Sequence, residues 1–201
     1  INKIFKVTTF GESHCDSVGV IIDGCPPNIE LFESDIQIQL DRRRPGQSNI
    51  STPRNEEDKA KILSGIENNK TLGTPLGIIV KNQNIKKEDY NFLNKEEYKP
   101  RPSHADLTYL LKYGIHASSG GGRSSARETI GRVIAGSIAE KIMKDKYNIE
   151  IVAWVSQIGD IKLDENLINF DSINRNDVDS NIVRMPDIIQ SSKAIDYIKN
   201  L

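Results

Sequence analysis

One segment with helical spacing, which follows three consecutive glycines, constrains the fold of this 201-residue chain most strongly. From Ile130 to Ile142 the apolar residues recur at steps of three and four, as they do on the buried face of an amphipathic helix. Ser125 and Glu128 have the S-x-x-E spacing of a capping box. We therefore predict a long helix over about 124–146, which is the strongest helix signal in the sequence.

Short apolar runs bounded by turn residues predict strands before and after this helix. The runs are "FKVTTFG" (5–11), "GVIIDG" (19–24), "TPLGIIVKN" (74–82) and "IEIVAWVSQIGDI" (149–161). Strands flanked by a long helix place the chain in the mixed α/β (α+β) class.

Two further segments are predicted to be helical. The stretch "ESDIQIQLDRRRPG" alternates as a strand would, but Ser34 and Gln37 have a capping spacing and Pro45 ends the run, so we favour a helix. The stretch 103–113 has helical spacing, with Ser103 as its N-cap. Residues from about 164 to 201 are polar and predicted to be rich in loops, with a short helical piece near the end and an abrupt stop.

The charges and cysteines exclude several classes of protein. The formal net charge of −1 argues against a nucleic-acid or membrane partner, whereas local clusters of arginine indicate pockets for small anions. No apolar run is long enough to span a bilayer, and no secretory signal is visible. Cys15 and Cys25 are too few for a disulfide framework, so we expect reduced thiols and a cytoplasmic chain.

The segment "GGGRSSARET" (120–129) can be interpreted in two ways. A helix N-terminus attracts anions, the glycines permit close approach, and Arg123 and Arg127 add charged donors. The alternative is a flexible linker capped by Ser125. Local spacing alone does not separate the two.

Three more polar stretches carry candidate site residues. In "GESH", His14 lies on a turn where it could transfer a proton, or it is an exposed turn histidine. In "RPSHAD", Asp106 either orients His104 or favours the helix N-terminus. The arginines of "DRRRPGQS" bind an anion or complement the end of a helix dipole, and at most two of the three can face one ligand. No Cys/His cluster predicts a metal site.

Taken together and in order, these stretches resemble the chorismate synthase family. The resemblance rests on "FGESH", "GVIIDGCPP", "LDRRRPGQS", "LSGIENNKTLGTPLGIIVKN", "RPSHADLTY" and "KYGIHASSGGGRSSARETIGRVIAGSIAEK", from about Phe5 to Asp160. "GESHC" and "RPSHAD" are similar to the fungal and other eukaryotic members. The resemblance implies a β-α-β sandwich core, a homotetramer, and elimination of phosphate from 5-enolpyruvylshikimate 3-phosphate to give chorismate. It also implies a need for reduced FMN without net redox change.

The resemblance also implies roles for individual residues. His14 would protonate the departing phosphate, and His104 would stabilise the reduced flavin. Ser13 and Ser125 would relay protons. Arg43 and Arg44 would hold the substrate, and Arg123, Ser124 and Ser125 would bind FMN. If the Ser125 oxygen is committed to a capping box with Glu128, Ser124 becomes the better flavin contact.

Three consequences of the resemblance stay open at this stage. A substrate arginine of the family corresponds to about Asn49 here, so the chain departs from the family at that contact. Family members are much longer, so we expect residues 1–201 to be the N-terminal portion of a single domain, inactive alone. Some eukaryotic-type members reduce their flavin with NADPH, and no dinucleotide fingerprint decides this. The competing classes are a flavin reductase and a non-catalytic module that binds anions or nucleic acid.

Overall fold

The computed structural model describes residues 4–48, 50–51, 56–83, 99–115 and 121–201. The chain forms two compact units. The first comprises Ile1–Arg44 and Glu56–Tyr147, and the second comprises Pro45–Asn55 and Asn148–Leu201. Each unit has its own cluster of buried apolar side chains, so each is described by itself.

The first unit is built on a four-stranded antiparallel sheet with the order β1-β2-β6-β3. Its strands are β1 (Lys6–Gly11), β2 (Ser17–Asp23), β3 (Ala60–Ser64) and β6 (Leu76–Lys81). Two short strands, β4 (Ile66–Glu67) and β5 (Lys70–Thr71), form a separate ladder. Strands predicted over 5–11, 19–24 and 74–82 are thereby confirmed, whereas β3, β4 and β5 were not predicted.

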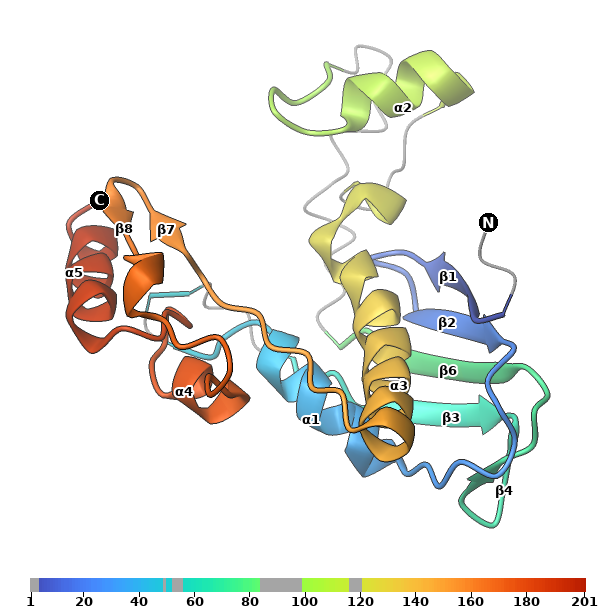
Figure 1. Ribbon diagram of the computed structural model, residues 1–201. Helices are drawn as coiled ribbons and strands as arrows, with labels where there is room; N and C mark the ends of the chain where they lie inside the picture. Colours follow the sequence, from blue (N-terminus) through green and yellow to red (C-terminus); the bar gives the residue numbers. More distant parts are fainter. Residues whose placement is uncertain (1–3, 49, 52–55, 84–98, 116–120) are drawn as a thin grey trace. The chain divides into compact units, whose positions relative to one another are not determined.

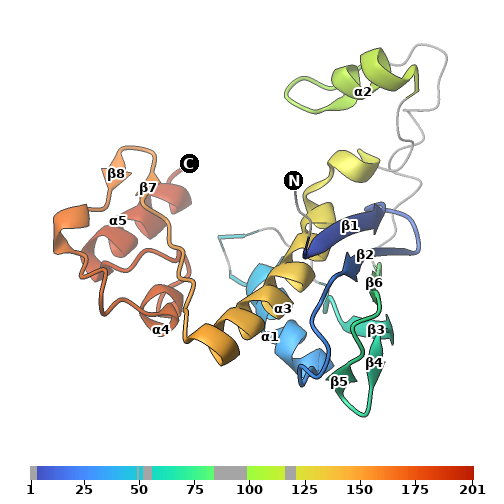
Figure 2. The ribbon, with the colours of Figure 1, turned by 45° about the vertical axis from the view of Figure 1, so that its right-hand side comes forward.

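Two helices, α1 (Glu33–Arg43) and α3 (Thr129–Tyr147), cover one face of this sheet (Figures 1 and 2). The core between the two layers contains Ile36 and Leu40 of α1, Ile130, Ile134 and Ile138 of α3, and the inward residues of β2 and β6. At Gly131 a Cβ would lie 3.0 Å from the carbonyl oxygen of Gly19, so glycine allows α3 to approach the sheet closely. The predicted α+β class is confirmed. The sheet and the two helices that cover it correspond to one β layer and the α layer of the expected β-α-β sandwich.

The beginnings of the helices differ from the prediction. Two 3₁₀ turns, η2 (Gly122–Ser124) and η3 (Ala126–Glu128), precede α3, which therefore begins at Thr129. The capping box of Ser125 and Glu128 is wrong, because the Ser125 N–H donates to the Gly122 carbonyl at 3.3 Å and the Glu128 carboxylate binds arginines. The Glu128 carboxylate thus pairs with Arg123 and Arg132 and does not bond back to the start of the helix.

The two other predicted N-caps are also wrong. Helix α1 begins at Glu33, where the Phe32 N–H donates to the Asp35 carboxylate at 2.9 Å. Helix α2 (Asp106–Tyr113) begins after Ala105, and Ser103 has a φ of +61° in the turn that precedes it. Both helices nevertheless lie where the apolar spacing predicts them.

The second unit combines short helices with one hairpin. Its elements are η4 (Glu165–Leu167), α4 (Arg175–Asp179), α5 (Ile188–Lys199), β7 (Gln157–Ile158) and β8 (Ile161–Lys162). Buried Leu163, Val183, Met185 and Ala194 form its core. The strand predicted over 149–161 is wrong except at Gln157–Ile158 and at Ile161, which begins β8. Trp154 and Val155 pack on this core and lie in no strand.

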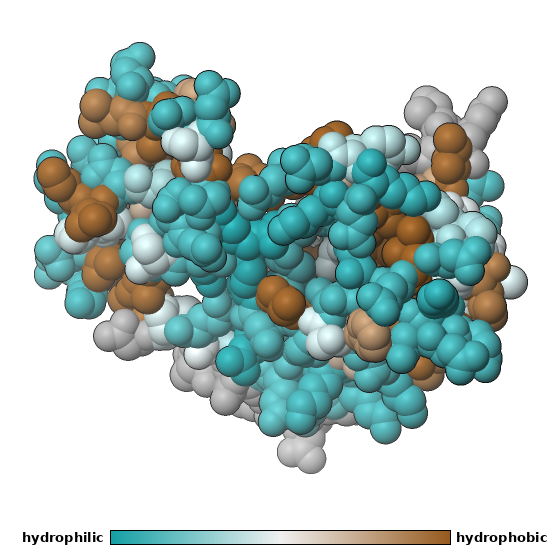
Figure 3. All heavy atoms as spheres, turned by 60° about the horizontal axis from the view of Figure 1, so that its bottom comes forward, coloured by the Kyte–Doolittle hydropathy of each residue, from teal (hydrophilic) through white to brown (hydrophobic). Residues whose placement is uncertain are grey.

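Figure 3 shows a mostly hydrophilic face with scattered hydrophobic side chains. Within the described residues, no helix is both long enough and apolar enough to cross a membrane.

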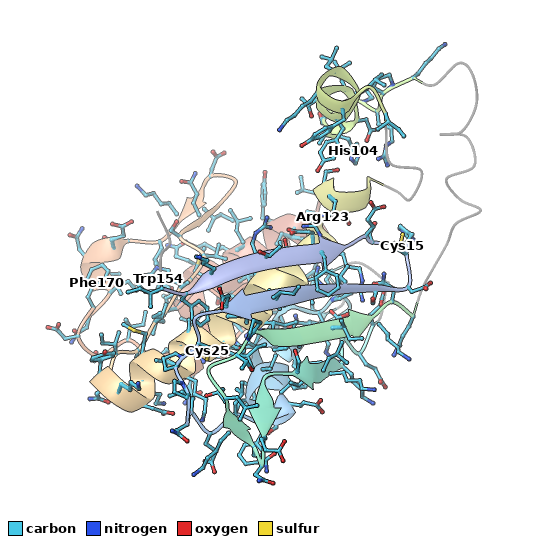
Figure 4. All side chains as sticks on the ribbon, turned by 90° about the vertical axis from the view of Figure 1, so that its right-hand side faces the viewer. Cys15, Cys25, His104, Arg123, Trp154 and Phe170 are labelled. Carbon is cyan, nitrogen blue, oxygen red and sulfur yellow. The ribbon has the colours of Figure 1, made fainter. Side chains whose placement is uncertain are left out.

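The two cysteines differ in burial and in expected reactivity. Both are free thiols, and they lie toward opposite ends of the sheet (Figure 4). Cys25 is 2% exposed, and burial raises the pKa of its thiol because desolvation disfavours the thiolate, more than Lys146 lowers it. Cys15 is half-buried.

We predict that an alkylating reagent at pH 8 labels Cys25 at least about tenfold more slowly than Cys15, as measured by peptide mass spectrometry over time. The rates should converge in urea, where both thiols are exposed. Because burial disfavours the thiolate, the free energy of unfolding should fall as the pH rises from the reference pKa of 9.0 through the raised folded-state pKa of Cys25. Faster labelling of Cys25 than Cys15 in the folded chain would contradict this assignment of burial.

Candidate functional site

Four buried polar side chains lie at the point where three of the polar stretches meet. They are Glu56, Asp58, Asn82 and Arg127, and we call them the buried cluster. Arg127 is 3% exposed although it carries a full positive charge. A buried charge needs close partners of opposite sign, so the contacts of this arginine organise the site.

The Arg127 guanidinium lies between two carboxylates. Its Nη2 is 2.8 Å from Oε2 of Glu56, and its Nη1 is 2.9 Å from Oδ1 of Asp58. These are close ion pairs more than aligned hydrogen bonds, because Arg127 Nη2 and Asp58 Oδ1 have no partner with hydrogen-bond geometry in the described part of the chain. The Nε of Arg127 donates to the side-chain oxygen of Asn82.

Both carboxylates come from the segment that leads into β3, in which Asp58 has a left-handed φ of +47°. Residues 56, 58 and 60 are buried and residues 57, 59 and 61 are exposed. Glu57 therefore points outward and pairs with Lys59 at 2.7 Å, which lowers the pKa of its carboxyl. Glu56 and Asp58 point inward from the same segment.

Asn82 connects the cluster to the turn that carries His14. Its Nδ2 donates to the carbonyl oxygen of Glu12 at 2.9 Å and to that of Cys15. Its backbone N–H donates to the carbonyl oxygen of Asp16 at 3.0 Å. These bonds hold the turn against the end of β6. His14 is 6% exposed and Ser13 is 2% exposed, so the alternative of an exposed turn histidine is wrong.

Arg43 joins the cluster from the C-terminal end of α1. Its Nη1 is 3.1 Å from Oδ2 of Asp58, its Nε donates to the hydroxyl of Thr129, and its Nη2 donates to the Ala126 carbonyl. The adjacent arginines point elsewhere. Arg42 donates to Gln39 at 2.8 Å, and Arg44 lies 3.8 Å from Asp41. The expectation that at most two of the three arginines share one direction agrees with this arrangement.

Arg123 is engaged with β1 and with Glu128. Its Nη1 donates to the Gly11 carbonyl at 2.9 Å, and its Nη2 donates to the Thr9 carbonyl at 3.0 Å and to Glu128 at 2.8 Å. Figure 4 shows the side chain behind β1, toward the same end of the sheet as Cys15. The segment after the glycines is therefore fixed to the sheet, and from residue 121 onward it is not a flexible linker.

The two serines of this segment use their hydroxyl groups differently. Ser124 is exposed and donates to the Gly121 carbonyl at 2.7 Å. Ser125 accepts from the Arg127 N–H at 3.3 Å, so it caps η3. Accepting uses an oxygen lone pair, so the Ser125 hydroxyl proton is not consumed by capping. Capping and proton relay are therefore compatible at Ser125.

His104 has a different environment from His14. It is exposed in the turn before α2, and Figure 4 shows it beside that helix. The Asp106 carboxylate accepts from the backbone N–H of Arg101 at 3.1 Å and from its Nε at 2.8 Å and Nη2 at 3.0 Å. Asp106 thus holds Arg101 at the start of the helix.

Two residues that carry predictions, Asn49 and Gly120, lie outside the described ones. Conversely, three members of the buried cluster, Glu56, Asp58 and Asn82, were not predicted as site residues. Arg127 was considered only as a donor of the Gly-Arg segment. The inward alternation at 56 and 58 is the signal that could have identified the carboxylates.

Comparison with known proteins gives consistent relatives. The family model described as chorismate synthase matches residues 5–201. A chorismate synthase of Prochlorococcus marinus (strain MIT 9215) is 57% identical over 199 residues, which are 99% of this chain and 53% of the relative. A chorismate synthase of Schizosaccharomyces pombe is 64% identical over 160 residues, 80% of this chain and 40% of the relative.

A solved structure described as a crystal structure of chorismate synthase has a similar fold. The two chains superpose with a TM-score of 0.73 at 26% identity, over 98% of this chain and 54% of the other. The chain spans about half the length of the curated relatives it matches.

Proposed function

Because the chain belongs to the chorismate synthase family, we propose that the full-length protein containing it eliminates phosphate from 5-enolpyruvylshikimate 3-phosphate to form chorismate. The observation that carries the proposal is the meeting of "GESH", "DRRR" and "SSAR" at the buried cluster. These stretches are separated by tens of residues in the sequence. Their residue types suit an anionic substrate that has to lose phosphate.

Arg43 supports binding of the substrate anions. Its guanidinium is anchored by Asp58 and by the oxygens of Thr129 and Ala126, while 20% of the side chain stays exposed. An arginine that is fixed in this way binds phosphate or carboxylate with little loss of side-chain entropy. Arg44, which is paired with Asp41 on the surface, is proposed as a secondary contact.

His14 is proposed to supply the proton that the departing phosphate needs. An imidazole titrates near neutral pH, and a leaving group is expelled more easily when it is protonated. The turn of His14 is fixed through Asn82 by bonds to the backbone carbonyls of Glu12 and Cys15, which hold the turn in place. Ser13, which is buried next to it, is proposed to take part in the same proton transfer.

The segment around Gly121 fits the phosphate of a bound FMN. Gly121 has a φ of +101°, and a Cβ there would lie 3.3 Å from the Ser124 hydroxyl oxygen and 3.7 Å from Nη2 of Arg101. The backbone of Gly121 therefore lies near the Arg101 guanidinium, a charged donor of the kind that binds phosphate groups, with no side chain of its own in the way. When bound, reduced FMN would supply electron density transiently to the reacting ring.

The other proposed flavin residues differ in how well they fit. Ser124 fits because it is exposed beside Gly121, and Ser125 keeps a hydroxyl proton for transfer. Arg123 fits as the residue that fixes the loop to β1 through Gly11 and Thr9. His104 is proposed to face the flavin from the turn before α2, where its exposure leaves it accessible. A homotetramer in the cytoplasm is proposed from family membership alone.

A flavin titration tests this function against a nucleic-acid-binding module. The full-length protein is mixed with FMN, and then with 5-enolpyruvylshikimate 3-phosphate, while the flavin absorbance is recorded. We expect a perturbed flavin spectrum that changes again when substrate is added. An unperturbed spectrum together with salt-sensitive retention on RNA would favour the binding module.

A further inference from the structure

Asp58 is the carboxylate shared by the two arginines of the site. Its Oδ2 lies 3.1 Å from Nη1 of Arg43, and its Oδ1 lies 2.9 Å from Nη1 of Arg127. The Asp58 side chain is fully buried, whereas 20% of the Arg43 side chain is exposed. Asp58 therefore cannot touch a ligand at the surface directly, but it contacts a residue that can.

The charges of this group are balanced. Arg43 and Arg127 carry two positive charges, and Glu56 and Asp58 carry two negative ones. Arg127 alone leaves one carboxylate charge uncompensated, so Arg43 is drawn to Asp58 by an attraction that is weakly screened in this buried setting. The oxygens of Thr129 and Ala126 fix the other nitrogens of the guanidinium, which sets its plane as well as its position.

We propose that Asp58 is a positioning residue that holds the Arg43 guanidinium in the orientation in which it binds the anionic group of the substrate. This inference rests on the function proposed above. Asp58 acts through Arg43 and has no contact of its own with the reacting atoms. Loss of its charge frees Arg43 to adopt other rotamers, so substrate binding weakens. The groups that take part in the chemical step are unchanged, so kcat is affected little.

A double-mutant cycle tests the proposal in the full-length enzyme. Arg43→Ala, Asp58→Asn and the double variant are compared with the wild type for kcat, for the KM of the enolpyruvyl substrate and for the Kd of FMN. We expect Asp58→Asn to raise KM about tenfold with kcat changed less than about threefold and FMN affinity unchanged. In the Arg43→Ala background, Asp58→Asn should raise KM by less than about twofold.

Glu57→Gln is the matched control. It removes one carboxylate charge from the next position of the same segment, but Glu57 is exposed and pairs with Lys59. Its KM should equal that of the wild type. The positioning role is wrong if Asp58→Asn raises KM by the same factor with or without Arg43. It is also wrong if Asp58→Asn lowers kcat and FMN affinity while it raises KM.

Asp58→Glu keeps the test decisive if Asp58→Asn does not fold. This variant retains the charge and moves the carboxylate by one methylene group, so KM should rise by about threefold with kcat unchanged. A KM equal to that of the wild type would overturn the proposal. Failure of the wild-type enzyme to form chorismate would instead overturn the proposed function, and the two failures are therefore distinguishable.

Discussion

Replacing His14 with alanine in the full-length protein is expected to lower kcat by about 10²–10⁴-fold, the usual contribution of a positioned acid or base. The turn that carries His14 is held by backbone carbonyls of Glu12 and Cys15 that bind Asn82, and the imidazole takes no part in those bonds. These bonds remain in the variant, so the turn should keep its place. Turnover with reduced FMN and thermal unfolding of the same preparation measure the two effects.

Two further variants separate a chemical role from a structural one. Cys15→Ala changes the adjacent residue of the same turn, whose thiol has no proposed role, and should retain nearly full turnover. His104→Ala should also lower turnover severely, because His104 is proposed to stabilise the reduced flavin. Nearly wild-type turnover in both histidine variants would remove the roles assigned to them.

Replacing Arg127 with alanine is expected to cost about 3–5 kcal/mol of folding free energy, because it leaves two buried carboxylates without their common partner. Glu56 and Asp58 have no exposed side-chain surface, so water cannot replace the guanidinium without opening the structure. The effect should extend to the His14 turn, since Asn82 would also lose its bond from Arg127 Nε. Denaturant unfolding monitored by circular dichroism measures the loss.

Arg132→Ala is the control for this prediction. Arg132 lies in α3, directly after the η3 turn that carries Arg127, and pairs with Glu128 at 2.6 Å, but 65% of its side chain is exposed. Because the Arg132 guanidinium is mostly hydrated and the buried Glu128 keeps Arg123 as a partner, we expect a loss of at most about 1 kcal/mol. Equal losses of stability for the two arginine variants would contradict the central position of Arg127 in the buried cluster.

Strands β1, β2 and β6 and helices α1 and α3 could be predicted because their apolar residues repeat with the period of one element. The helix beginnings could not, because they depend on contacts between distant residues. Glu128 does not make its predicted capping bond, in part because its carboxylate binds Arg123. Arg123 is itself fixed by the carbonyls of Thr9 and Gly11. Strand β3 depends on pairing with β6, and the five-residue run "AKILS" alone does not predict it.

The site was predicted only in part for the same reason. His14 and Arg43 carry a recognisable chemistry and lie in motifs, so the sequence predicts them. Asp58 and Asn82 are ordinary polar residues in sequence, and their importance comes from Arg127, which is 45 positions beyond Asn82. A carboxylate pair at alternating inward positions before a strand is a local sign that one cation will be buried there.

Formation of chorismate by the full-length protein under anaerobic conditions tests the central claim most directly. We predict that phosphate and chorismate appear in equal amounts with reduced FMN present, that the flavin is not consumed, and that residues 1–201 alone give no product. Release of phosphate without chorismate, or no product from the full-length protein with reduced FMN, would contradict the account.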